Sequence, residues 1–127
     1  TTAIFVFLEH SFNEVLKYLS LLSTNLIPLL LEIKLMKCGN LYEALEMIKL
    51  ARNFKMKIML GCMIESSVAI TAASHLSPLV DYADLDGNLL IEDDPYQGVT
   101  VKNGRLKLPK EHGLGVKLKH IKNKDLL

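Results

Sequence analysis

Short apolar runs alternate in this chain with longer segments in which apolar side chains recur every three or four positions. The runs cover residues 3–8, 29–35, 57–60 and 79–85, and each has the length of a strand. Periodicity alone does not separate a strand from a buried helical segment at 29–35. The short length of this run, and flanking residues that interrupt a helix, such as Pro28, favour a strand there.

The segments between these runs have the spacing of amphipathic helices. Each opens with residues that favour a helix N-cap, namely Ser11 or Asn13, then Asn40, then Ser66 or Ser67. Their apolar positions are Val15, Leu16, Leu19 and Leu22; Leu41, Ala44, Leu45, Ile48 and Ala51; and Val68, Ile70, Ala73 and Leu76. Strand and helix in regular alternation predict an α/β fold with parallel strands and right-handed crossovers.

The alternation of predicted strands and helices ends at Gly87, and a different pattern follows. Residues 99–108 alternate around Asn103-Gly104, a pair that suits the type I′ turn of a β-hairpin. Pro109 and the glycines that follow predict an irregular tail. Residues 117–127 are basic and lack aromatic side chains, so we interpret them as a solvated tail.

Size and charge limit the function classes. The 127 residues are expected to form one domain over 1–127, and the net charge of +1 gives no reason to expect a nucleic-acid or membrane partner. No apolar run reaches the ~18 residues of a membrane span.

Cys38 and Cys62 do not have the spacing of metal ligands, and we interpret them as free thiols. The first residues lack a basic start, with Glu9 directly after the apolar run, so a cytoplasmic location is expected.

Lys34 is the first candidate for chemistry, because it lies where the second predicted strand ends. The carboxyl ends of strands are where α/β barrels hold their catalytic groups. One interpretation is a lysine whose stem packs in the sheet while its ammonium reaches solvent. The other is a general base kept partly neutral by burial and by a second cation, Lys37.

Asp84 and Asp86 are the second candidates. Two positions apart in a strand, both carboxylates would point to one face, where like charges need a metal ion or a substrate ammonium. The alternative is a strand end whose aspartates reach water and cap the turn at Gly87. Glu65 is either a substrate contact or the first-turn acid of a helix.

Four segments together resemble the last barrel strands of the enolase superfamily, in its muconate-cycloisomerase-like branch. They are residues 33–39, 59–66, 70–76 and 81–87. Asp84-Leu85-Asp86 resembles, within that branch, dipeptide epimerases of the L-Ala-D/L-Glu kind. The resemblance covers about residues 29–116, and residues 1–28 match poorly. It implies a partial TIM-like barrel of about the last four strand–helix units, with a C-terminal β-hairpin and tail.

The resemblance also implies roles. Lys34 would be an acid/base lysine, Asp84 and Asp86 would hold the α-ammonium of a dipeptide, and Cys62, Met63 and Ile64 would line the pocket. The reaction would be a 1,1-proton transfer at the α-carbon of a dipeptide such as L-Ala-L-Glu, through an enediolate stabilised by Mg²⁺.

The family's second lysine and two of its three metal ligands belong to earlier strands. The resemblance therefore implies a complementing N-terminal half as partner, and the open edges of an unclosed sheet favour a homo-oligomer as the alternative. Glu9 stands at about the place of the third ligand, in an altered segment. One carboxylate cannot hold Mg²⁺, which takes octahedral oxygen coordination. A non-catalytic scaffold or binding module therefore stays open as an alternative, as does another cycloisomerase activity, although the latter would leave the paired aspartates without a use.

Overall fold

The computed structural model describes residues 4–7 and 29–119. Four parallel strands form one sheet in the order β1-β2-β3-β4. The strands are β1 (Ile4–Phe7), β2 (Leu29–Lys34), β3 (Lys57–Gly61) and β4 (Tyr82–Ala83). Their parallel pairing confirms the α/β prediction. The helix predicted after Ser11 or Asn13, and Glu9, lie outside the described residues.

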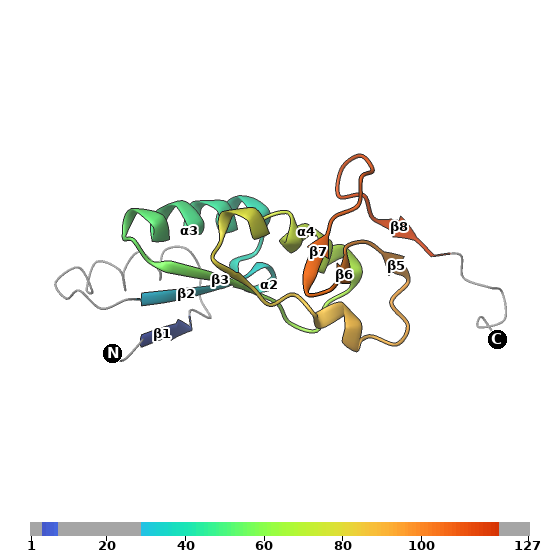
Figure 1. Ribbon diagram of the computed structural model, residues 1–127, viewed down its shortest axis with the longest axis horizontal. Helices are drawn as coiled ribbons and strands as arrows, with labels where there is room; N and C mark the ends of the chain where they lie inside the picture. The colour runs from blue at the N-terminus through green and yellow to red at the C-terminus, as the bar shows by residue number, and fades with distance from the viewer. Residues whose placement is uncertain (1–3, 8–28, 120–127) are drawn as a thin grey trace.

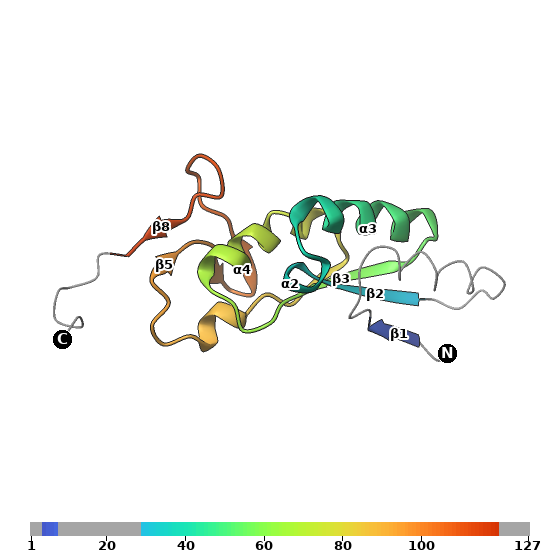
Figure 2. The same ribbon diagram turned by 180° about the vertical axis from the view of Figure 1, so that it is seen from behind.

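Helices connect the strands along one side of the sheet. A short helix, α2 (Leu35–Cys38), follows β2 directly and was not predicted. The longer α3 (Leu41–Asn53) then leads to β3, and α4 (Ser67–Ser74) lies between β3 and β4. Figures 1 and 2 show α3 lying along β2 and β3, with β1 at the far edge of the sheet. One face of the sheet is therefore covered by α3, and α4 adds Ile70 and Ala73 to the same core.

Alternate positions along β2 and β3 divide the sheet into a packed face and an open face. Leu31, Ile33, Ile58 and Leu60 are fully or almost fully buried and form the core with Ala44, Met47, Ile48 and Ala51 of α3. Because side chains alternate along a strand, the intervening residues point away from α3. We call this second surface, made of Glu32, Lys34, Met59 and Gly61, the open face.

The starts of the two longer helices, α3 and α4, are capped differently. Asn40 caps α3 as predicted, since its Oδ1 accepts the Glu43 N–H at 2.9 Å. Ser66 occupies the N-cap position of α4 without a capping hydrogen bond from its side chain. Instead, Asp94 Oδ2 accepts the Ser67 N–H at 2.6 Å. The cap of α4 therefore comes from a residue far along the chain.

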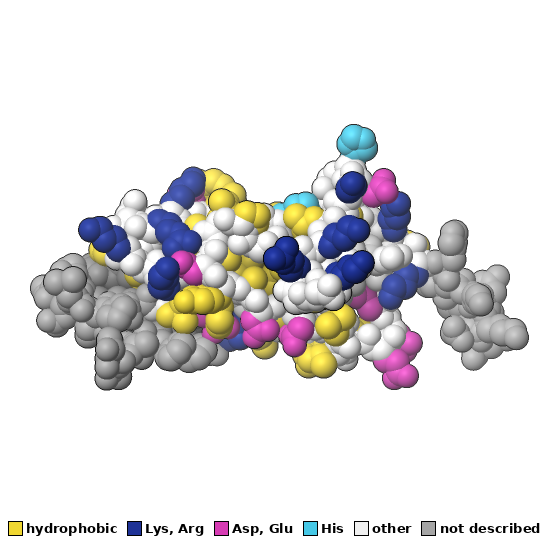
Figure 3. Space-filling view, viewed as in Figure 1, with side chains coloured by type: hydrophobic (Ala, Val, Ile, Leu, Met, Phe, Trp, Pro, Cys, Tyr) yellow, Lys and Arg dark blue, Asp and Glu magenta, His cyan; other side chains and the backbone are white. Residues whose placement is uncertain are grey.

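The C-terminal part lies beyond the end of the sheet. It contains the 3₁₀ turn η2 (Gly87–Leu90) and the strands β5 (Tyr96–Gln97), β6 (Thr100–Lys102), β7 (Arg105–Lys107) and β8 (Lys117–Leu118). The predicted hairpin is confirmed: β6 pairs with β7 around Asn103 and Gly104, whose φ angles are 52° and 71°. Lys and Arg side chains gather over this region in Figure 3. Within the predicted tail, Lys117 Nζ lies 2.8 Å from Glu111 Oε1, and Lys119 Nζ donates to the Asp94 carbonyl at 2.8 Å.

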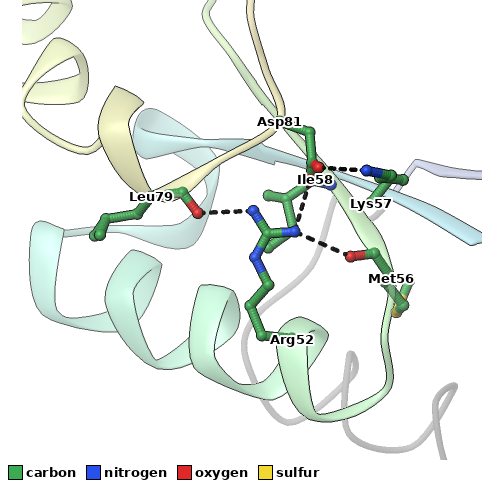
Figure 4. A network of polar contacts seen from close by, with 6 residues as sticks. All are labelled: Arg52, Met56, Lys57, Ile58, Leu79 and Asp81. Atoms are coloured by element: carbon green, nitrogen blue, oxygen red, sulfur yellow. Dashed lines mark hydrogen bonds and ion pairs between the residues drawn. The ribbon is translucent and has the colours of Figure 1, made fainter.

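The fourth strand is shorter than predicted. Residues 79–85 were expected to be extended, but a 3₁₀ turn that contains Pro78, η1 (Ser77–Leu79), reaches the first of them, and only Tyr82–Ala83 pairs as β4. Asp81 joins this segment to β3 through its carboxylate, which lies 2.6 Å from Arg52 Nη1 and 2.8 Å from Lys57 Nζ (Figure 4). Its backbone N–H also donates to the Ile58 carbonyl. These contacts fix β4 in register at the amino ends of the strands.

Across residues 4–7 and 29–119, none of the helices is both long and apolar enough to cross a membrane.

Candidate functional site

Three consecutive strands end at the same edge of the sheet. β2 ends at Lys34, which is in register with Gly61 at the end of β3. The loop 62–65 follows Gly61, and Asp84 follows β4. Because the strands are parallel, their carboxyl ends meet. The structure therefore brings Lys34, the loop after β3 and the turn after β4 to one edge.

Lys34 carries an ion pair on the open face. Its Nζ lies 3.2 Å from Glu32 Oε1, and the two side chains are 26% and 11% exposed. Lys34 is thus mostly buried rather than extended into water. Lys37, proposed from the sequence as a second cation near Lys34, lies in α2, after β2 has ended.

Glu32 was not identified as a site residue from the sequence. The signal was present, because a charged residue inside an apolar run and two positions before Lys34 must share its face of the strand. Gly61 makes room for this pair. A β-carbon at Gly61 would lie 2.5 Å from Glu32 Oε1 and 3.3 Å from Lys34 Cε.

Asp84 and Asp86 are both exposed, with buried Leu85 between them. The prediction that both belong to one strand is wrong, because β4 ends at Ala83 and Asp86 has φ −101° and ψ −1° at the start of η2. Asp84 still continues the ladder, since its N–H donates to the Leu60 carbonyl at 2.9 Å. The Asp86 side chain makes no capping hydrogen bond. Both carboxylates therefore face solvent, where a cation can reach them.

The loop after β3 packs directly against the turn after β4. Cys62 Sγ lies 4.0 Å from Asp86 Oδ1. Burial raises the pKa of the Cys62 thiol, and the carboxylates of Asp86 and Asp84 raise it further. A β-carbon at Gly87 would collide with the Met63 carbonyl and lie 3.1 Å from Cys62 Sγ. This contact places Cys62 beside the paired aspartates.

Comparison with known families identifies the fold. Residues 10–122 match the family described as enolase C-terminal domain-like. The chain belongs to this family. The predicted resemblance and the partial (β/α) barrel fold are thereby confirmed.

Relatives of this enolase C-terminal-like domain include dipeptide epimerases. An L-Ala-D/L-Glu epimerase of Bacteroides thetaiotaomicron is 54% identical over 86 residues, which cover 68% of this chain and 22% of that protein. The structure of a dipeptide epimerase from Methylococcus capsulatus complexed with Mg ion has a TM-score of 0.67 at 36% identity, covering 71% of this chain and 27% of that one. A substrate-liganded L-Ala-D/L-Glu epimerase from Bacillus subtilis has a TM-score of 0.66 at 31% identity, covering 81% and 28%. The chain thus spans about a quarter of the length of the relatives it matches.

The remaining residues of the loop after β3 divide between the surface and the interior of the domain. The side chains of Met63 and Ile64 are 41% and 65% exposed, so they lie at the rim of this edge. Glu65 is buried, and its Oε1 accepts the Met63 N–H at 2.8 Å. Glu65 therefore folds the loop, rather than facing a substrate or lying in the first turn of α4, which begins at Ser67.

The described part of the domain does not fit a magnesium ion. Over residues 4–7 and 29–119, no three His, Cys, Asp or Glu side chains come together as a set of metal ligands. Mg²⁺ requires octahedral oxygen coordination and keeps its water unless carboxylates replace it. Asp84 and Asp86 are two carboxylates without a third partner of that kind among these residues. An organic ammonium suits such a pair better.

Proposed function

We propose that this chain forms the carboxyl-edge part of a dipeptide epimerase active site, which moves a proton at the α-carbon of a dipeptide such as L-Ala-L-Glu. The observation that carries the proposal is the meeting of Lys34, Cys62 and the paired aspartates at the ends of three consecutive parallel strands. Relatives named as dipeptide epimerases support the substrate class. The ends of barrel strands are where this fold carries its chemistry.

Lys34 is assigned the acid/base role at the α-carbon. Its amine lies on the open face, at the carboxyl end of β2, and points away from α3, which covers the other face. A 1,1-proton transfer removes the α-proton on one face of the carbon and returns a proton on the other. Lys34 serves one of these two faces, and the group that serves the other lies outside the described residues.

Asp84 and Asp86 are assigned to the α-ammonium of the dipeptide. Their exposed carboxylates stand on the same edge as Lys34, and two like charges within three residues of the chain favour a nearby cation. Cys62, Met63 and Ile64 are assigned to the pocket wall, because this loop packs against the turn that carries Asp86. An apolar wall with a few fixed polar groups is typical of a small-molecule site.

The remaining strands of the barrel are assigned to a complementing N-terminal half or to a second copy of the chain. Eight strands close a (β/α) barrel, whereas the described sheet has four and both residues of β4 are exposed. An exposed sheet edge favours pairing with further strands. A magnesium ion, present in a neighbour's structure, would be held mainly by carboxylates of those strands, with Glu9 as this chain's candidate.

Exchange of the α-proton for deuterium tests the proposal. The chain, alone and mixed with the remaining strands of a relative, is incubated with L-Ala-L-Glu and Mg²⁺ in D₂O and followed by NMR. We expect exchange that Lys34→Ala abolishes and that Lys37→Ala, three residues further on, retains. Exchange that survives Lys34→Ala would refute the assignment.

A non-catalytic binding module is the second candidate, and the lack of a three-ligand metal cluster in the described residues favours it. Calorimetric titration with the dipeptide separates the two. Binding that depends on Asp84 and Asp86, without α-proton exchange in the complemented protein, would support the binding module and reject the epimerase.

A further inference from the structure

One carboxylate beside Lys34 has no role in the proposed reaction. Glu32 Oε1 lies 3.2 Å from Lys34 Nζ, and the Glu32 side chain is only 11% exposed. Both residues belong to β2 and are two positions apart, so the geometry of the strand holds them on one face. A carboxylate this far from water is costly unless a cation compensates it. Lys34 provides that cation.

Gly61 shows that the pair is built into the sheet. The neighbouring strand has no side chain at the position in register with Lys34. The space that a β-carbon would fill at Gly61 is taken by Glu32 Oε1, 2.5 Å from that position, and by Lys34 Cε, 3.3 Å from it. An ion pair on a solvated surface is not confined in this way, and its contribution to stability is small. Here both partners are confined by the backbone of β3.

We propose that Glu32 is a positioning residue, which holds Lys34 as an ammonium ion over Gly61 and so makes Lys34 the proton donor of the reaction. This inference rests on the acid/base role proposed for Lys34. A base on the opposite face of the substrate takes the α-proton, and the C–H electron pair stays on the substrate. One N–H proton of Lys34 then passes to the α-carbon, which leaves a neutral amine beside the Glu32 carboxylate. A proton from solvent restores the ion pair.

Competitive acetylation of the full chain with acetic anhydride tests the inference without any substrate. Only a neutral amine attacks the anhydride, so the rate at each lysine reports how often that amine is unprotonated. Mass spectrometry after digestion gives the rate at Lys34 relative to exposed Lys55. Glu32→Gln removes the charge and nearly keeps the shape. We expect the relative rate at Lys34 to rise about fivefold in Glu32→Gln and to return most of the way in Glu32→Asp.

An unchanged rate at Lys34 in folded Glu32→Gln would overturn the inference, because burial alone would then explain the lysine's reactivity. If circular dichroism shows that Glu32→Gln does not fold, the unsubstituted chain is acetylated in increasing NaCl. Salt screens a pair that is partly exposed, so the rate at Lys34 should rise relative to Lys55. A constant ratio would overturn the inference. Neither readout requires α-proton exchange, so failure of the proposed function and failure of this inference are distinguishable.

Discussion

Asp81 ties three segments together at the amino ends of the strands, and its replacement should destabilise the fold. Its carboxylate lies 2.6 Å from Arg52 Nη1 and 2.8 Å from Lys57 Nζ, and it accepts the Ile58 N–H at 2.9 Å (Figure 4). The Arg52 guanidinium also donates to the Leu79 carbonyl at 3.0 Å. Asp81→Ala removes the carboxylate and leaves the Ile58 N–H without its acceptor.

The size of the destabilisation expected for Asp81→Ala follows from how exposed each partner of Asp81 is. Lys57 is 62% exposed, so water and salt screen its pair, and we assign it no stabilisation. Arg52 is 41% exposed, and its pair with Asp81 contributes about 1 kcal/mol. The Ile58 hydrogen bond to a carboxylate that is 16% exposed contributes about 1.5 kcal/mol more. Asp81→Ala should therefore lower the free energy of unfolding by about 2.5 kcal/mol near neutral pH.

The effect should depend on pH in one direction. The Lys57 ammonium, the Ile58 N–H and the Arg52 guanidinium hold the pKa of Asp81 well below its usual 3.8. The unfolded chain therefore binds a proton at higher pH than the folded chain, and acid removes the stabilisation. The difference between the unsubstituted chain and Asp81→Ala should stay constant down to about pH 5 and shrink below it.

Urea unfolding followed by circular dichroism measures both quantities. Asp93→Ala is the matched control, since Asp93 is exposed and makes no ion pair with a described residue. It should change the free energy of unfolding by less than about 0.5 kcal/mol. Equal effects of the two substitutions, or an Asp81→Ala difference that persists unchanged in acid, would refute the reasoning.

Three more results are expected elsewhere in the chain. Asp94→Ala removes the buried carboxylate that accepts the Ser67 N–H. It should lower the free energy of unfolding, measured by urea unfolding, by about 2 kcal/mol. An unchanged free energy would show that water replaces the cap. Gly98→Ala drives a β-carbon into the Thr71 hydroxyl, and should lower the thermal midpoint, whereas an unchanged midpoint would mean that the hairpin moves freely. Cys62 should react with iodoacetamide several-fold more slowly in the folded chain than in urea at neutral pH, because burial raises its pKa; equal rates would contradict this.

Features that depend on neighbours in the sequence could be predicted. Asn40 caps α3 by accepting the N–H of Glu43, only three residues later. Asn103 and Gly104 supply the two residues with positive φ that the hairpin turn needs. Lys34 was placed correctly near a strand end, because the run predicted as a strand closes at residue 35 and β2 ends at Lys34. These signals are complete within a few residues, so no knowledge of distant partners is needed.

Features that depend on distant partners could not be predicted in the same way. The cap of α4 comes from Asp94, 27 residues after Ser67, although Ser66 is a suitable cap by residue type. The strand predicted over 79–85 pairs only at Tyr82–Ala83, and it is held in register by Asp81, whose partners Arg52 and Lys57 come from other segments. The partnership of Glu32 with Lys34 depends on the empty position at Gly61, which only the register of β2 and β3 reveals.

The two ends of β3 serve different purposes: its amino end contributes to stability, and its carboxyl end contributes to the candidate site. At Lys57 it begins within the ion pairs of Asp81, and at Gly61 it ends beside Lys34. The loop residues 62–64 and 84–86 follow the carboxyl ends, so substitutions there leave the Asp81 contacts untouched. A protein divided in this way can evolve toward new substrates at one end of its strands while selection on folding acts at the other.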